Sequence, residues 1–185
     1  MYNTLMRILG IDPGIGRMGW GVIQMATHSK SFHSDDASPS KRAGQASKWQ
    51  IVNSGCVETA KDMAIEKRLQ LLHDELTYIL THEKPEEVAI EDLFFNTNAK
   101  TAMIVGEARG VILLTVSQHH LPIATYTPLQ VKIAVTGYGR AEKKQVEKMM
   151  MAQLGIKKKP EIDDTADALA IALTHAFSYK LKKLL

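Results

Sequence analysis

Five carboxylates in this chain lie where a regular element is expected to meet a loop. Asp12 ends a short apolar segment, Glu91 ends another, and Asp163, Asp164 and Asp167 open a longer apolar segment near the C-terminus. The i,i+3 spacing of Asp164 and Asp167 puts both carboxylates on one face of a helix, in its first turn. Because rigid elements present such terminal side chains to substrates, these residues are candidates for a catalytic site.

Carboxylates that converge suit a divalent-cation site. Two carboxylates about 4 Å apart repel each other by about 4 kcal/mol at an effective dielectric constant near 20, and bound cations remove that cost. Oxygen ligands favour Mg2+ or Mn2+ over zinc, and Cys56 is the only cysteine. Two such ions roughly 3.5 to 4 Å apart can activate water and stabilise the leaving oxygen of a phosphodiester. These residue types therefore predict metal-assisted hydrolysis.

Each carboxylate also has an ordinary structural explanation. Asp163 or Asp164 could cap a helix, because Asp is a favoured N-cap residue. Asp12 stands before Pro-Gly and could simply form a turn. Glu91 could be a surface acid at the end of a strand. Because all of these residues stand at the ends of elements, a shared role explains them better than several unrelated structural roles.

Hydrophobic periodicity predicts an α/β protein with a mixed five-stranded sheet. The expected strands are Arg7–Asp12, Trp20–Met25, Ile51–Val57, Val88–Glu91 and Ile123–Tyr126. The expected helices run from about Ile65 to the Pro85 region, from about Ala99 to Gln118, from about Ala141 to Leu154 and from about Asp164 to Phe177. If the first and fourth strands are neighbours, their terminal carboxylates meet at one edge of the sheet.

Length and composition indicate a globular protein of one domain. The chain has 185 residues, of which 45% are hydrophobic and 23% are charged, so we expect residues 1–185 to form a single domain. Residues 27–48 are polar and show no apolar periodicity, which is typical of a flexible loop. Apolar runs are shorter than the roughly 18 to 20 residues of a membrane span, and the N-terminus lacks a signal-peptide core, so we expect a cytoplasmic location.

The charge balance is compatible with an anionic partner but does not identify one. The formal net charge is +3 and the sequence pI is about 8.9, a small margin for a nucleic-acid-binding protein. Basic residues gather in the C-terminal third, at Lys132, Lys143, Lys144, Lys148 and Lys157–Lys159. They could contact phosphates, or they could form solvated helix faces.

Several separated segments resemble the RuvC family of Holliday junction resolvases, which are crossover junction endodeoxyribonucleases. They are LGIDPGIGRMGWGVI, AIEDLFF, GEARGVIL, QVK, AEKKQV and DDTADALAIALTH, in this order along the chain. The resemblance implies a ribonuclease-H-like fold with helices on both faces of the sheet. It also implies a homodimer that nicks two opposing strands of a four-way junction symmetrically during recombination and repair, and it suggests the branch-migration proteins RuvA and RuvB as partners.

The resemblance also implies roles for individual residues. Asp12, Glu91, Asp164 and Asp167 match the positions of the family's metal ligands and catalytic carboxylates, with two Mg2+ ions in each site and Mn2+ as a substitute. Asp163 lies i,i+4 from Asp167 and could replace Asp164 on the same helix face, although the D-x-x-D spacing favours Asp164.

Three further positions match the family's DNA-binding residues. Lys132 and Lys143 fall where the family places basic residues near the scissile phosphate. Phe94 falls where the family has an aromatic residue that contacts bases at the junction, and we expect it to face DNA while Phe95 packs inward.

The sequence departs from the family pattern in one segment and leaves other functions open. The segment 27–48 resembles an insertion between strands, and Met6 is an alternative start. A related ribonuclease-H-like nuclease that processes RNA and a junction-binding protein without catalysis are alternatives. An actin-like ATP-binding domain would need a second Asp-Pro-Gly hairpin and a longer chain.

Overall fold

The structure is a computed structural model that describes residues 6–26, 49–92 and 99–184. The predicted insertion at 27–48 lies outside the described residues, as do Phe94 and Phe95. None of the described helices combines the length and the apolar composition that crossing a membrane requires.

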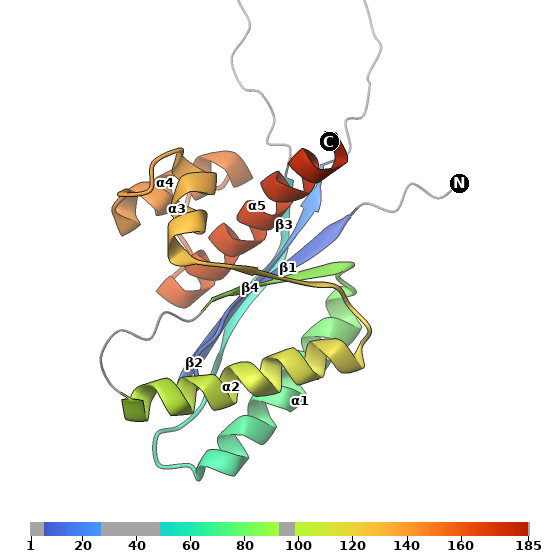
Figure 1. Cartoon of the computed structure of the whole chain (residues 1–185), viewed down its shortest axis with the longest axis vertical. Helices are drawn as coiled ribbons and strands as arrows, with labels where there is room; N and C mark the ends of the chain where they lie inside the picture. Colours follow the sequence, from blue (N-terminus) through green and yellow to red (C-terminus); the bar gives the residue numbers. More distant parts are fainter. Residues whose placement is uncertain (1–5, 27–48, 93–98, 185) are drawn as a thin grey trace, which may run out of the picture.

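A mixed sheet of five strands forms the centre of the described structure (Figure 1). Its spatial order is β3-β2-β1-β4-β5. The strands are β1 Arg7–Asp12, β2 Arg17–Met25, β3 Trp49–Glu58, β4 Glu87–Glu91 and β5 Ile123–Tyr126. The first three strands pair antiparallel, whereas β4 runs parallel to both β1 and β5. The parallel pairing brings the C-terminal ends of β1 and β4 to the same edge.

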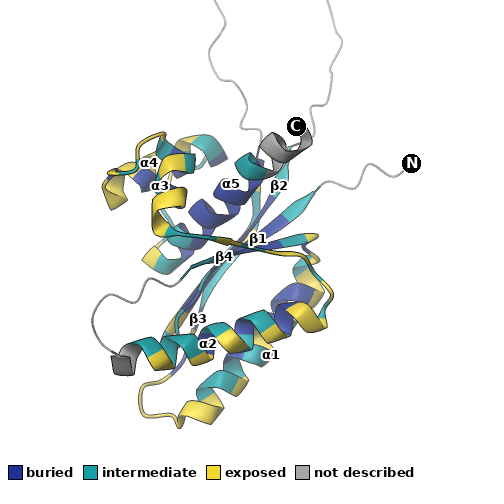
Figure 2. Cartoon of the chain, viewed as in Figure 1, coloured by how far each residue is buried: buried dark blue, intermediate teal, exposed yellow. Residues whose placement is uncertain are grey.

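Helices cover both faces of this sheet (Figure 1). They are α1 Ile65–Glu83, α2 Ala99–Gln118, α3 Pro128–Thr136, α4 Lys143–Leu154 and α5 Asp163–Leu184. The pair α1 and α2 lies on one face, and α5 lies on the other with α3 and α4 beside it. The most deeply buried residues lie between these helices and the strands (Figure 2).

The alternation of side chains along β1 explains why two separate cores form. Leu9 and Ile11 belong to the core under α1 and α2, whereas Ile8 belongs to the core under α5. Successive side chains of a strand point to opposite faces, so a strand that is apolar throughout must be covered on both sides.

Two glycines allow α5 to lie unusually close to the sheet. A Cβ atom at Gly10 would lie 2.1 Å from the carbonyl oxygen of Ala168, and one at Gly19 would lie 2.0 Å from that of Asp164. Such distances are far below van der Waals contact, so only glycine permits this backbone-to-backbone approach. The first turn of α5 is thereby held directly against β2.

The observed elements follow the sequence predictions in order, with shifts of several boundaries and one additional helix. Strand β2 begins at Arg17 and not at Trp20, and the final helix extends beyond Phe177. The helix α3 was not predicted, because its nine residues are too short for a clear apolar period. Its start nevertheless carries a sequence signal: Thr127 and Gln130 form a capping box around a proline at the first turn.

Candidate active site

The register of the sheet makes Asp12 and Glu91 neighbours. Strands β1 and β4 are parallel, and Ile11 pairs with Ile90, so the next residue on each strand is a carboxylate at the same sheet edge. On its other side, Asp12 pairs with Gly19 of β2. Gly19 in turn touches the backbone of Asp164. The start of α5 therefore lies beside the end of β1.

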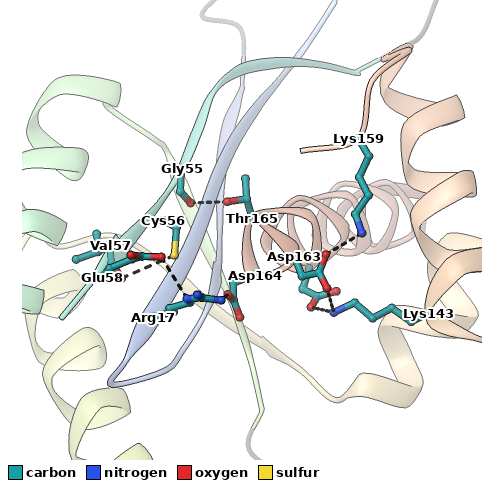
Figure 3. Close-up of polar contacts among 11 residues, drawn as sticks. Arg17, Gly55, Cys56, Val57, Glu58, Lys143, Lys159, Asp163, Asp164 and Thr165 are labelled. Atoms are coloured by element: carbon teal, nitrogen blue, oxygen red, sulfur yellow. Dashed lines mark hydrogen bonds and ion pairs between the residues drawn. The ribbon is translucent and has the colours of Figure 1, made fainter. Parts of the chain in front are cut away.

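Three polar contacts, made by two residues of α5, hold the helix in this position. Near its start, the Thr165 hydroxyl donates a hydrogen bond of 3.0 Å to the carbonyl oxygen of Gly55 on β3 (Figure 3). Further along, the Nε2 atom of buried His175 lies 2.5 Å from the Glu87 carboxylate on β4, and its Nδ1 atom lies 2.8 Å from the Tyr126 hydroxyl. The helix that carries Asp164 is thus tied to both halves of the sheet.

Asp12 lies at the electrostatic centre of the site. Burial raises the pKa of its carboxyl group to about 8, and the negative charges of Glu91, Asp167 and Asp164 contribute to the rise. A hydrogen bond between the Asp12 and Glu91 side chains also raises the pKa of Asp12 and opposes the rise at Glu91. The fold thus brings four of the candidate carboxylates close enough for their charges to interact.

Glu91 responds to the same surroundings. Its pKa is raised by burial and by the charge of Asp167, while the hydrogen bond from Asp12 and the charge of Lys143 oppose the rise. Among the described residues, no group of three or more His, Cys, Asp or Glu side chains has the geometry of a preformed metal site. The carboxylates therefore form an open cluster with an excess of negative charge.

Two cations offset part of this charge (Figure 3). Lys143, the first residue of α4, places its Nζ atom 2.8 Å from Asp167 Oδ2. Arg17 at the start of β2 lies with its Nη1 atom 3.8 Å from Asp164 Oδ2 and its Nε atom 3.2 Å from Glu58 Oε1. Arg17 was not predicted as a site residue, because its partner Asp164 is far away in the sequence.

Asp163 is placed differently from Asp164. The Asp163 side chain is 59% exposed, compared with 30% for Asp164, and it accepts a hydrogen bond of 2.7 Å from Lys159 (Figure 3). This hydrogen bond lowers the pKa of Asp163, as do the charges of Lys143 and Lys159. Of the two adjacent residues, Asp164 is the one whose charge reaches Asp12.

The other candidate residues are less closely connected to the carboxylates. Lys132 lies on α3, half-buried, and within the described part of the chain its side chain has no ion pair with the acidic cluster. Phe94 lies outside the described residues. Arg109 of α2, which was not predicted, places its Nη2 atom 3.4 Å from Asp92, the residue that follows Glu91.

Cys56 lies near the cluster but does not suit a metal ligand. Burial is the main reason that the pKa of its thiol rises to about 11, and the charge of Asp164 adds to the effect. A thiol must lose its proton to bind zinc. The donor set that remains consists of carboxylate oxygens, which suits hard divalent cations.

Comparison with known proteins decides the family. A family model described as crossover junction endodeoxyribonuclease RuvC matches residues 41–175. The chain belongs to the RuvC family. A RuvC of Fusobacterium nucleatum is 45% identical over 170 residues, which are 92% of this chain and 80% of that protein. A RuvC of Caldicellulosiruptor saccharolyticus is 45% identical over 173 residues, which are 94% of this chain and 93% of that protein.

The RuvC family resemblance extends to three-dimensional structure. The structure of Thermus thermophilus RuvC in complex with a Holliday junction substrate matches with a TM-score of 0.81 and 33% sequence identity, covering 96% of each chain. This likeness confirms the prediction of a ribonuclease-H-like fold with a mixed five-stranded sheet and helices on both faces.

Proposed function

We propose that this RuvC-family chain is an endonuclease that resolves four-way DNA junctions by paired symmetric nicks in recombination and repair. The observation that carries the proposal is the position of Asp12, half-buried at the sheet edge among three other carboxylates. A related RuvC from Thermus thermophilus is described in complex with a Holliday junction substrate. Membership of an endodeoxyribonuclease family and an acidic cluster suited to cations support the same chemistry.

The four carboxylates Asp12, Glu91, Asp164 and Asp167 would hold two Mg2+ ions, for which Mn2+ could substitute. The fit rests on the donor set and on its charge: burial and, after it, the negative charges of Glu91, Asp167 and Asp164 raise the pKa of Asp12, and a divalent cation would relieve the repulsion among these carboxylates. When bound, such ions activate water and stabilise the leaving oxygen in phosphodiester hydrolysis.

The basic residues would position the DNA. Lys143 extends from α4 to the carboxylate cluster, where it pairs with Asp167, and from there its ammonium group would bind the phosphate that is cut. Lys132 on α3 would bind the backbone further along. We retain Phe94 as the aromatic residue that contacts bases at the junction, on the strength of its position in the RuvC-like motif.

We further propose a homodimer that associates partly through α2. Met103 and Leu114 of this helix are 68% and 57% exposed. A Cβ atom at Gly106 or Gly110 would meet nothing within 4 Å in the protomer. Exposed apolar residues beside small residues suit the close approach of a second helix. A two-fold dimer would present two equivalent sites to the two equivalent strands of a junction.

The proposed function is accompanied by proposals on domain organisation, cellular location and partners. We propose that residues 1–185 form a single nuclease domain with an insertion at 27–48, that the protein acts in the cytoplasm, and that RuvA and RuvB are its branch-migration partners. These proposals are supported by the family and by the DNA substrate that the family name implies.

One experiment tests the function against its alternatives. The purified protein is incubated with a four-way junction, a linear duplex and an RNA/DNA hybrid, each with and without Mg2+, and Asp12→Asn serves as the inactive control. We expect paired symmetric nicks in the junction only with Mg2+. Cleavage of the hybrid alone would favour an RNA-processing nuclease, and binding without any cleavage would favour a junction-binding protein.

A further inference from the structure

Asp163 forms a chain of ion pairs at the rim of the candidate active site. Its carboxylate accepts a hydrogen bond of 2.7 Å from Lys159, and the Nζ atom of Lys159 also lies 2.9 Å from Glu147 on α4. The Asp163 Oδ2 atom lies 3.8 Å from the Nζ atom of Lys143. Figure 3 shows Lys143 and Lys159 approaching Asp163 from the same side of α5.

Lys143 therefore has two possible carboxylate partners on α5. The nearer partner is Asp167, at 2.8 Å, and the farther is Asp163, at 3.8 Å. Partial burial lowers the pKa of Lys143, but the hydrogen bond to Asp167 and the charges of Asp167 and Asp163 raise it overall. The Lys143 ammonium group is thus held by both carboxylates, with Asp167 dominant.

This arrangement has a consequence when Asp167 binds a metal ion. A carboxylate that coordinates a divalent cation has less negative charge to offer an ammonium group, and the cation itself repels that group. Lys143 would then move away from the site unless a second carboxylate held it. Asp163 is the carboxylate in that position, 3.8 Å from the Lys143 Nζ atom.

We propose that Asp163 is a positioning residue that keeps Lys143 at the active site when Asp167 is engaged by metal. The proposal rests on the proposed function, in which Asp167 is a metal ligand and Lys143 binds the scissile phosphate. Lys159 orients Asp163, and Glu147 anchors Lys159. Because Glu147 belongs to the same helix as Lys143, α4 both presents the lysine and orients the carboxylate that holds it.

The ion pairs at Asp163 are exposed, which separates this role from a structural one. The Asp163 side chain is 59% exposed and that of Lys143 is 51% exposed. Ion pairs in such positions contribute little to folding stability. Asp163→Asn should therefore unfold at nearly the same temperature as the native chain while changing the behaviour of Lys143.

Kinetics of the full chain on a four-way junction at saturating Mg2+ provide the first test. We expect Asp163→Asn to lower kcat about three- to tenfold, which corresponds to the loss of a partial electrostatic contact, with KM unchanged. Asp163→Glu should restore most of the rate. The matched control is Glu161→Gln, which removes an exposed carboxylate paired with Lys158 at 3.0 Å in the same segment; it should leave the rate unchanged.

A double-mutant cycle tests whether Asp163 acts through Lys143. In a Lys143→Met background, Asp163→Asn should cause no further loss of kcat, because the group that it positions is gone. An equal loss in both backgrounds would overturn the proposal. It would show that Asp163 acts on the carboxylates or on the fold directly.

A measurement without DNA separates this proposal from the proposed function. The ammonium signal of Lys143 in 1H–15N NMR spectra is followed while Mg2+ alone is added. We expect the signal to persist in the native chain and in Glu161→Gln, and to broaden in Asp163→Asn as the ammonium group is released. Persistence in Asp163→Asn would overturn the proposal. Failure of the native chain to cut junctions would contradict the proposed function, while the Mg2+ titration would still decide whether Asp163 holds Lys143.

Discussion

Asp12 is partly buried and lies near other carboxylates, and both its burial and their negative charges raise the pKa of its carboxyl group. Asp12→Asn preserves the size of the side chain but removes its ability to ionise and bind a cation. We expect this variant to lose junction cleavage while it keeps its fold and its affinity for junction DNA. Cleavage assays, melting curves and gel-shift assays with Ca2+ in place of Mg2+ measure these three properties. Near-normal turnover would contradict the assignment of Asp12 as a metal ligand.

The two adjacent aspartates at the start of α5 should differ in their effects. Asp164 interacts with Asp12, whereas Asp163 is engaged by Lys159. We expect Asp164→Asn to abolish cleavage and Asp163→Asn to reduce it only moderately. The comparison uses single-turnover cleavage rates at several Mg2+ concentrations. The reverse order would move the metal-ligand assignment by one residue.

The raised pKa of Asp12 also predicts how the stability of the metal-free protein depends on pH. The ordinary pKa of the group is 3.8 and the folded-state value is about 8, so between these values the folded state binds more protons than the unfolded state. Stability should therefore fall as the pH rises through this window, by at most about 1.4 kcal/mol per pH unit for this group. Glu91, whose pKa is also raised, acts in the same direction.

Urea unfolding of the metal-free chain at about pH 5 and about pH 8 measures this dependence. Asp12→Asn is the matched control, because it removes the titrating group, and its stability should fall less over the same interval. Added Mg2+ should flatten the dependence by favouring the ionised carboxylates. Equal slopes for the native chain and Asp12→Asn would contradict the burial of a protonated Asp12.

At the scale of elements, the critical contact is the one between α5 and the glycines of the sheet. A Cβ atom at Gly19 would lie 2.0 Å from the carbonyl oxygen of Asp164, so Gly19→Ala must displace the first turn of α5. We expect a loss of about 1 to 3 kcal/mol in the free energy of unfolding, together with weaker Mn2+ binding measured by calorimetry.

Gly16→Ala is the control for this substitution. A Cβ atom at Gly16 would lie 3.6 Å from the Arg68 guanidinium, which is ordinary contact, so this variant should change stability and Mn2+ binding little. If Gly19→Ala bound Mn2+ as well as the native chain, the position of α5 would not determine the geometry of the carboxylates.

At the scale of the whole molecule, the prediction concerns association through α2. Gly106 faces open space in the protomer, so Gly106→Leu should leave the protomer folded but obstruct a partner helix. We expect sedimentation at micromolar concentration to give a dimer for the native chain and a larger monomer fraction for this variant. Ala108→Leu is the contrast, because Ala108 is fully buried and a larger side chain there should destabilise the protomer itself. A native chain that is strictly monomeric and still makes paired nicks would contradict the role of this interface.

Much of the architecture could be predicted from the sequence, because its signals are local. The strands β1, β4 and β5 and the helix α2 follow from periodicity and from flanking turn residues. Asp12 and Glu91 end β1 and β4, and the three candidate aspartates of the C-terminal segment lie near the start of α5. The dependence on local signals also explains which elements could not be predicted correctly. The short helix α3 has too few residues for a clear period, and β2 starts earlier than predicted because pairing with β3 extends it through Arg17.

Only the tertiary structure decided which charged groups and backbone segments lie beside each carboxylate. The spacing of the aspartates left Asp163 and Asp164 as alternatives, and the contacts separate them: Lys159 engages Asp163, while Gly19 brings the backbone of Asp164 beside Asp12. Arg17 also could not be assigned to the site from the sequence, because its partner Asp164 lies far away in the chain. A pKa, an ion pair or a close backbone contact depends on distances between residues far apart in the chain, and only packing determines those distances.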